Sequence, residues 1–80
     1  MTKGIKKLTR REQEFLHAAA MGLKNHEIAK KFLVSEHTVK KTLENIFVKI
    51  EAKDRTNAVA IAILNKLILV EELFIQLKDK

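Results

Sequence analysis

The chain is short and basic: its 80 residues include 16 Lys or Arg and 10 Asp or Glu, giving a formal net charge of +6. This length suits one domain around one core, and the absence of cysteine excludes disulfides and zinc–thiolate sites. At 46% hydrophobic the sequence is too apolar for a disordered chain, yet no stretch approaches the roughly 20 apolar residues of a membrane-spanning helix. The basic segment 1–7 is not followed by the apolar run of a signal peptide. The lack of cysteine fits a reducing cytoplasm, where we expect the protein to act with no membrane partner.

The excess positive charge lies in the first two-thirds of the chain. Residues 1–55 contain thirteen Lys or Arg and seven Asp or Glu, whereas residues 56–80 contain three of each. This distribution is expected if the first part binds a polyanion. A basic surface can equally be exposed to solvent without binding anything, so the residue pattern must distinguish these two possibilities.

Apolar residues recur at spacings of three and four throughout, and the sequence contains no proline. This periodicity predicts an all-α fold. The first helix is expected near 10–21. Its start is a capping box, in which Thr9 and Glu12 each satisfy a backbone amide of the other. Its end is marked by Gly22, which suits the left-handed residue that often follows a helix.

A short second helix is expected near 25–33, and after a brief break Ser35 caps a third helix over 36–50. Asp54 caps a fourth helix near 55–65. The apolar stripes of the four helices should meet in one core, made of Phe15, Leu16, Ala19, Ala20, Ile28, Ala29, Phe32, Val39, Leu43, Ile46, Phe47, Ile50, Ala58, Val59, Ala62 and Ile63.

The second and third predicted helices are joined by a very short turn, and the third carries lysines on its outer side. This arrangement describes a helix-turn-helix, a unit in which the second helix enters the major groove of DNA. On periodicity alone, other small helical bundles also fit.

Three motifs narrow the choice: LTRREQEFL over 8–16, GLKNHEIA over 22–29, and VSEHTVKKTLENIFVKI over 34–50, followed by Arg55, Ala58 and Val59. With them, residues 8–68 resemble the DNA-binding domain of LuxR/FixJ-type (GerE-like) bacterial transcription regulators. The resemblance implies a four-helix domain that binds double-stranded DNA sequence-specifically and regulates transcription. It also implies a homodimer through the fourth helix, and it makes RNA polymerase a further candidate partner.

The sequence departs from the resembled family's pattern at three positions. Thr42 stands where the family commonly has His, and Glu51 where it usually has Gly. Lys24 replaces the usual Ser or Thr cap of the second helix, which predicts a looser start for that helix.

The outer face of the predicted helix 36–50 carries the candidate DNA contacts. The resemblance implies that Lys40 contacts the DNA backbone or base edges, and that positions 41 and 44 vary with the operator. Glu44 would repel phosphate; it could accept from a cytosine amino group, pair with Lys40, or stay solvated. The predicted DNA-binding residues are Ser35, His37, Thr38, Lys40, Lys41, Glu44, Asn45 and Lys49.

The last residues, 69–80, extend beyond the usual end of the resembled family. Their apolar residues recur at helical spacing, which predicts a short amphipathic helix near 69–78. This extension either folds back on the core or joins the fourth helix in a two-fold dimer, which would demand an inverted-repeat operator. The predicted dimerisation residues are Ile61, Leu64, Ile68, Leu73, Phe74 and Leu77.

Other classes of function fit the sequence less well. The sequence has no Gly-rich loop and no nucleophile–base pair, so we do not expect an enzyme, and its three histidines lack metal-ligand spacing, so we expect neither metal nor cofactor. Two alternatives remain. One is the promoter-binding region of a sigma factor, which shares the L-T-x-R-E start. The other is a protein-interaction module, which Glu44 and the apolar C-terminus favour. The chain is either a stand-alone regulator or the output domain of a longer one.

Overall fold

The computed structural model describes residues 7–67, which form four α-helices. They are α1 (Arg10–Ala20), α2 (Asn25–Phe32), α3 (Glu36–Lys49) and α4 (Arg55–Leu64). The all-α fold and the four predicted helices are confirmed, and each helix ends one residue earlier than expected. The helix predicted near 69–78 lies outside the described residues.

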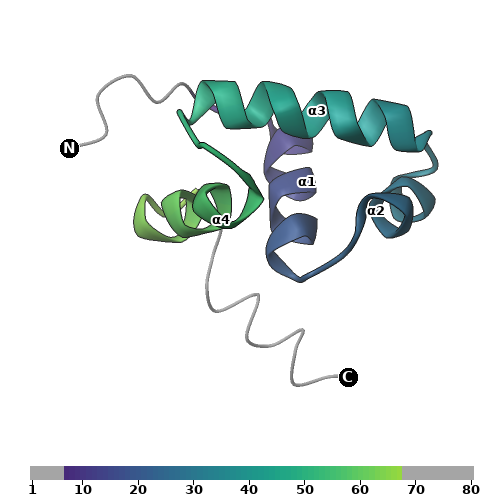
Figure 1. The fold of residues 1–80 in the computed structure, drawn as a ribbon, viewed down its shortest axis with the longest axis horizontal. Helices are drawn as coiled ribbons and strands as arrows, with labels where there is room; N and C mark the ends of the chain where they lie inside the picture. Colours follow the sequence, from purple (N-terminus) through teal and green to yellow (C-terminus); the bar gives the residue numbers. More distant parts are fainter. Residues whose placement is uncertain (1–6, 68–80) are drawn as a thin grey trace.

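Helix α1 is the centre of the fold. It packs against each of the other three helices, and α2 also packs against α3. Figure 1 shows α3 lying across one end of α1, with α2 and α4 on either side. This arrangement leaves one long side of α3 on the outside of the molecule.

The core lies between α1 and the helices around it. Its largest fully buried side chains are Phe15, Leu16, Ile28, Val39, Ile46 and Ile50. Of the predicted core, Ala20, Phe32, Phe47, Val59 and Ile63 are only half-buried. Conversely, Leu8 and Ala18 are buried although neither was in a predicted stripe. Three helices cover α1, so its buried face is wider than one stripe.

Side chains cap the starts of three helices. The Thr9–Glu12 capping box is confirmed: the Glu12 amide donates to Thr9 Oγ1 (3.1 Å) and the Thr9 amide donates to the Glu12 carboxylate (2.9 Å). Ser35 and Asp54 accept from amides at the starts of α3 and α4. At α2, the Lys24 amide donates to Glu27 (2.7 Å), but an ammonium cannot accept a hydrogen bond, so the other half of a capping box is missing.

All four helices end in the same way. Each is followed by a residue with φ between 56° and 89°, namely Gly22, Leu33, Glu51 and Lys66. The next amide donates to the carbonyl five residues back, at 2.8–3.2 Å, and the residue that carries this amide (Leu23, Val34, Ala52 or Leu67) packs against the core. This is the Schellman ending with its apolar contact. Only the first of the four uses the glycine that the conformation favours.

Candidate nucleic-acid interface

Helices α2 and α3 form the predicted helix-turn-helix. A turn of three residues joins Phe32 to Glu36, and the Val34 amide closes it on the Ala29 carbonyl at 3.0 Å. The turn is short enough to set the angle between the two helices, because Val34 packs against the core on one side and Ser35 caps α3 on the other. The motif predicted from the sequence is therefore present as a compact unit.

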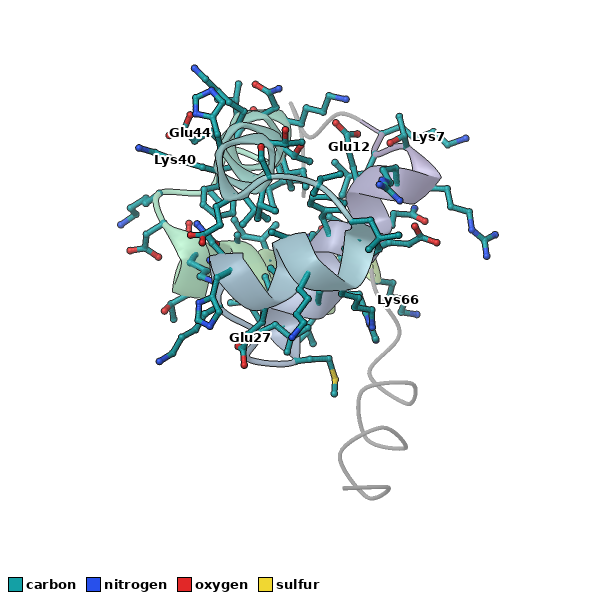
Figure 2. The ribbon with its side chains drawn as sticks, turned by 90° about the vertical axis from the view of Figure 1, so that its right-hand side faces the viewer. Lys7, Glu12, Glu27, Lys40, Glu44 and Lys66 are labelled. Atoms are coloured by element: carbon teal, nitrogen blue, oxygen red, sulfur yellow. The ribbon has the colours of Figure 1, made fainter. Side chains whose placement is uncertain are left out.

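The inner face of α3 holds the helix in place. Val39 and Ile46 have no exposed surface, and Leu43 is 3% exposed. Phe47 packs against the core beside them and is half-buried, whereas the opposite side of the helix faces away from the core. The predicted contact residues His37, Lys40, Lys41, Glu44 and Asn45 are all exposed. Figure 2 shows Lys40 and Glu44 extending outward from the same side of α3.

Ser35 and Thr38 lie together at the start of α3. The Thr38 amide donates to Ser35 Oγ (3.0 Å), and the Ser35 hydroxyl donates to Thr38 Oγ1 (3.0 Å). Both residues are exposed. The amides of Glu36 and His37 lie in the first turn of α3, where a helix has no backbone carbonyl to accept their hydrogen bonds. Their positive ends and the helix dipole make this end of α3 favourable for an anion.

Lys49 differs from the other predicted contact residues. Its ammonium lies 2.8 Å from both carboxylate oxygens of Glu12, and Figure 2 shows Glu12 on the other side of α3 from Lys40 and Glu44. Burial acts to raise the pKa of Glu12, but hydrogen bonds from Lys49 and Thr9 and the charge of Lys49 bring it below the ordinary value. Lys49 thus fastens the end of α3 to the start of α1, and its contact with DNA stays a prediction.

Arg55 has a positioning role that the sequence did not reveal. From the first turn of α4 its guanidinium donates to Asn25 Oδ1 (2.7 Å) and to the Leu23 carbonyl. These bonds tie α4 to the turn between α1 and α2. The partners are 30 and 32 residues away, so the only sequence signal was that Arg55 matches the family pattern.

A second arginine joins α1 to α2. The guanidinium of Arg11 lies over the rings of Phe15 (5.3 Å) and Phe32 (5.0 Å), and the two rings stack with centroids 4.6 Å apart. Such cation–π contacts stabilise by about 0.5–1 kcal/mol at exposed sites. They fix the first helix of the helix-turn-helix against the centre of the fold.

Only two of the predicted dimerisation residues, Ile61 and Leu64, lie within the described residues. Leu64 is 80% exposed, whereas Ile61 is half-buried and packs against the core. Ile68, Leu73, Phe74 and Leu77 lie outside the described residues. Within residues 7–67, no group of three potential metal ligands occurs, and no helix is long and apolar enough to cross a membrane.

A short turn between two packed helices, with the second exposing lysines along its outer side, defines the helix-turn-helix class of nucleic-acid-binding domains. The family model of bacterial regulatory proteins of the luxR family matches residues 6–62. The chain belongs to this family, as its motifs indicated.

Curated relatives agree with this assignment. The chain is 48% identical over 60 residues to the uncharacterized transcriptional regulatory protein YxjL of Bacillus subtilis, covering 75% of this chain and 28% of that protein. It is 49% identical over 53 residues to the CsgBAC operon transcriptional regulatory protein of Escherichia coli, covering 66% and 24%. For the response regulator protein VraR of Staphylococcus aureus the identity is 44% over 61 residues, covering 76% and 29%. The chain thus spans about a quarter of the length of these relatives.

Proposed function

We propose that this chain binds double-stranded DNA sequence-specifically as part of a transcription regulator, with α3 in the major groove. The observation that carries the proposal is the division of α3 into two faces. Val39, Leu43 and Ile46 are buried against the fold, while the lysines opposite them are exposed. Membership of the luxR family and the names of the relatives, which are transcriptional regulatory proteins and a response regulator, support it.

Within this proposal the exposed residues divide into two groups. Those at the start of α3 (Ser35, His37 and Thr38) suit phosphate contacts, because the helix end attracts anions. Lys40 reaches phosphate or base edges, and Lys41, Glu44 and Asn45 face the groove floor, where base edges can be read. Lys49 would join them only by leaving Glu12.

The second part of the proposal is a homodimer formed through α4. The exposed Leu64 and the outer edge of Ile61 would meet their counterparts, with Ile68, Leu73, Phe74 and Leu77 extending the contact. Two α3 helices would then lie about one turn of DNA apart, roughly 34–36 Å, and would require an inverted repeat. Removing residues 69–80 should weaken self-association in sedimentation velocity, and an unchanged monomer–dimer equilibrium would contradict this role of the extension.

The proposed function places the protein in the cytoplasm, near a second candidate partner. DNA binding in a bacterium occurs in the cytoplasm, and a regulator bound at a promoter lies close to RNA polymerase, which is a candidate second partner. The function is binding rather than catalysis.

The salt dependence of DNA binding tests the proposal directly. A dimer that neutralises about six phosphates should give a log–log slope of affinity against salt near −5, at roughly −0.9 for each contact. Fluorescence anisotropy with a labelled duplex of mixed sequence, between 50 and 200 mM salt, measures it. A flat response, or no binding at the lowest salt concentration, would favour the protein-interaction module instead.

A further inference from the structure

Glu44 is the one acid among the exposed residues of α3 that are predicted to contact DNA, which are His37, Lys40, Lys41, Glu44 and Asn45. With 3.6 residues per turn, it lies about 40° around α3 from Lys40 and about 60° from Lys41. All three side chains are exposed, and Figure 2 shows Glu44 and Lys40 pointing outward together. If α3 enters the major groove, this carboxylate enters with it.

No cation among residues 7–67 forms an ion pair with Glu44. Two ion pairs occur within residues 7–67, Arg10–Glu14 and Lys49–Glu12, and Glu44 belongs to neither. Lys40 precedes Glu44 by four residues, which is the less favourable order for an ion pair on a helix. A carboxylate carried unpaired toward a polyanion weakens binding unless it finds a hydrogen-bond donor there.

The donors on the floor of the major groove are few. A carboxylate can only accept hydrogen bonds, and the groove offers it two donors, the N4 amino group of cytosine and the N6 amino group of adenine. Beside the adenine amino group lies the N7 acceptor of the same base, which repels a carboxylate. Cytosine presents its amino group without such an acceptor, and its partner guanine offers O6 and N7 to a cation. A carboxylate therefore matches cytosine, and an ammonium beside it matches the guanine of an adjacent pair.

We propose that Glu44 is a specificity-determining residue that selects cytosine in the operator, with Lys41 bound to guanine in a neighbouring base pair. This inference rests on the proposed function, because it requires α3 to lie in the major groove. It assigns one base to one side chain of this chain. In a two-fold dimer the selected cytosine occurs once in each half-site.

The test compares sequences selected from a random duplex library by the wild-type protein and by two variants. Glu44→Ala should lose the cytosine preference at one position of each half-site and keep the rest of the motif. Glu44→Gln should shift that position toward adenine, since an amide can both donate to N7 and accept from N6. Glu51→Gln is the matched control: it removes the same charge from an exposed residue beyond the end of α3, and it should leave the motif unchanged.

A second measurement gives the size of the effect. Replacing the selected C·G pair by T·A should weaken wild-type binding about 5- to 150-fold, the usual range for one mismatched pair, and should change binding of Glu44→Ala less than threefold. Circular dichroism should show both Glu44 variants to be as helical as wild type, because the side chain is exposed and belongs to neither ion pair of residues 7–67.

The results separate this inference from the proposed function. If wild type selects a motif and Glu44→Ala selects the same motif with the same cytosine, the inference is overturned while DNA binding stands. Absence of any motif or any salt-dependent binding for wild type overturns the proposed function and the inference with it.

Discussion

The inner and outer faces of α3, a helix of 14 residues, differ in what determines their side chains. Side chains on the inner face are buried and in contact with α1 and α2, so their chemistry is set by packing. On the outer face, Lys40, Lys41 and Glu44 are exposed, and no residue described in the structure forms an ion pair with them. Substitutions on the inner face should therefore change stability, and those on the outer face should change binding.

The largest expected effect follows from Leu43→Ala on the inner face. Truncating a buried leucine costs about 2–5 kcal/mol, and a domain of this size has roughly 3–5 kcal/mol of stability in total. The variant should be largely unfolded at 37 °C, with DNA binding lost as a result. Urea denaturation followed by circular dichroism at 222 nm measures the change.

Lys41→Ala is the matched control for this prediction, since it lies two residues earlier on the opposite face. Its stability should stay within about 0.5 kcal/mol of wild type, as for most surface substitutions. If Leu43→Ala keeps the wild-type urea midpoint, the inner face does not hold α3 as described.

The next effect concerns binding by the outer face. Lys40→Ala should weaken binding to every duplex by roughly 1 kcal/mol, about fivefold, and reduce the magnitude of the salt slope by about 0.9 for each lysine lost. Lys41→Ala should change the preferred sequence more than the average affinity. Anisotropy titrations against specific and mixed duplexes distinguish the two variants.

These two variants also test whether the outer face of α3 binds DNA without contributing to stability. Neither should shift the thermal midpoint by more than about 2–4 °C, the shift that about 0.5 kcal/mol produces in a domain of this size, because both side chains are exposed. Wild-type DNA binding by both Lys40→Ala and Lys41→Ala would mean that α3 is not the reading helix.

A third prediction concerns the edge between the two faces, where Lys49 meets Glu12. Glu12→Gln keeps an acceptor for the Thr9 amide but removes the charge that binds Lys49, and it should destabilise the domain by about 1 kcal/mol at pH 7. The folded-state pKa of Glu12 is lowered, so its contribution is present above the unfolded pKa of about 4.3 and is lost as pH falls through the folded value. Thermal midpoints at pH 7, 5, 4 and 3 test both statements.

The difference in thermal midpoint between wild type and Glu12→Gln should become smaller as the pH falls below about 4.3, where the unfolded chain takes up a proton on this carboxyl. Glu14→Gln serves as the comparison, because Glu14 has only a 3.8 Å contact with the exposed Arg10. If the difference in thermal midpoint stays constant between pH 7 and pH 3, the ionised Glu12 carboxylate does not stabilise the fold.

The sequence predicted the starts of the helices better than the contacts between them. Thr9, Ser35 and Asp54 cap neighbours three residues away, so their signal is local. The Lys49–Glu12 pair spans 37 residues, and Arg55 reaches Leu23, in the turn between α1 and α2, across 32. Such pairings depend on how the helices pack, which apolar spacing does not specify.

For the candidate interface, sequence reasoning identified the outer face correctly but not the state of each side chain. The exposure of His37, Lys40, Lys41, Glu44 and Asn45 follows from the period of a helix whose opposite side is apolar. The period could not show that Lys49, on the flank between the two faces, has its ammonium on Glu12. It also could not choose between pairing and isolation of Glu44, because both leave the same pattern of charges.

The smallest expected effect lies just beyond α3, where Glu51 belongs to neither face. Its φ of 59° places an L-residue in the left-handed region, and the family pattern usually has glycine there. A left-handed conformation costs an L-residue about 1–2 kcal/mol, and glycine loses roughly 0.4–1 kcal/mol through the greater freedom of the unfolded chain. Glu51→Gly should therefore raise stability by about 0.5–1 kcal/mol in urea denaturation, with DNA affinity unchanged.

Glu51→Ala separates the backbone from the charge. It too removes an acid from the negative end of the helix dipole, which favours stability by a few tenths of a kcal/mol, but it keeps a Cβ in the left-handed conformation. If alanine stabilises as much as glycine does, the gain comes from the charge. If only glycine stabilises, the end of α3 is held against the backbone preference of Glu51, because the Ala52 amide must reach the Phe47 carbonyl (2.8 Å) for Ala52 to pack on the core.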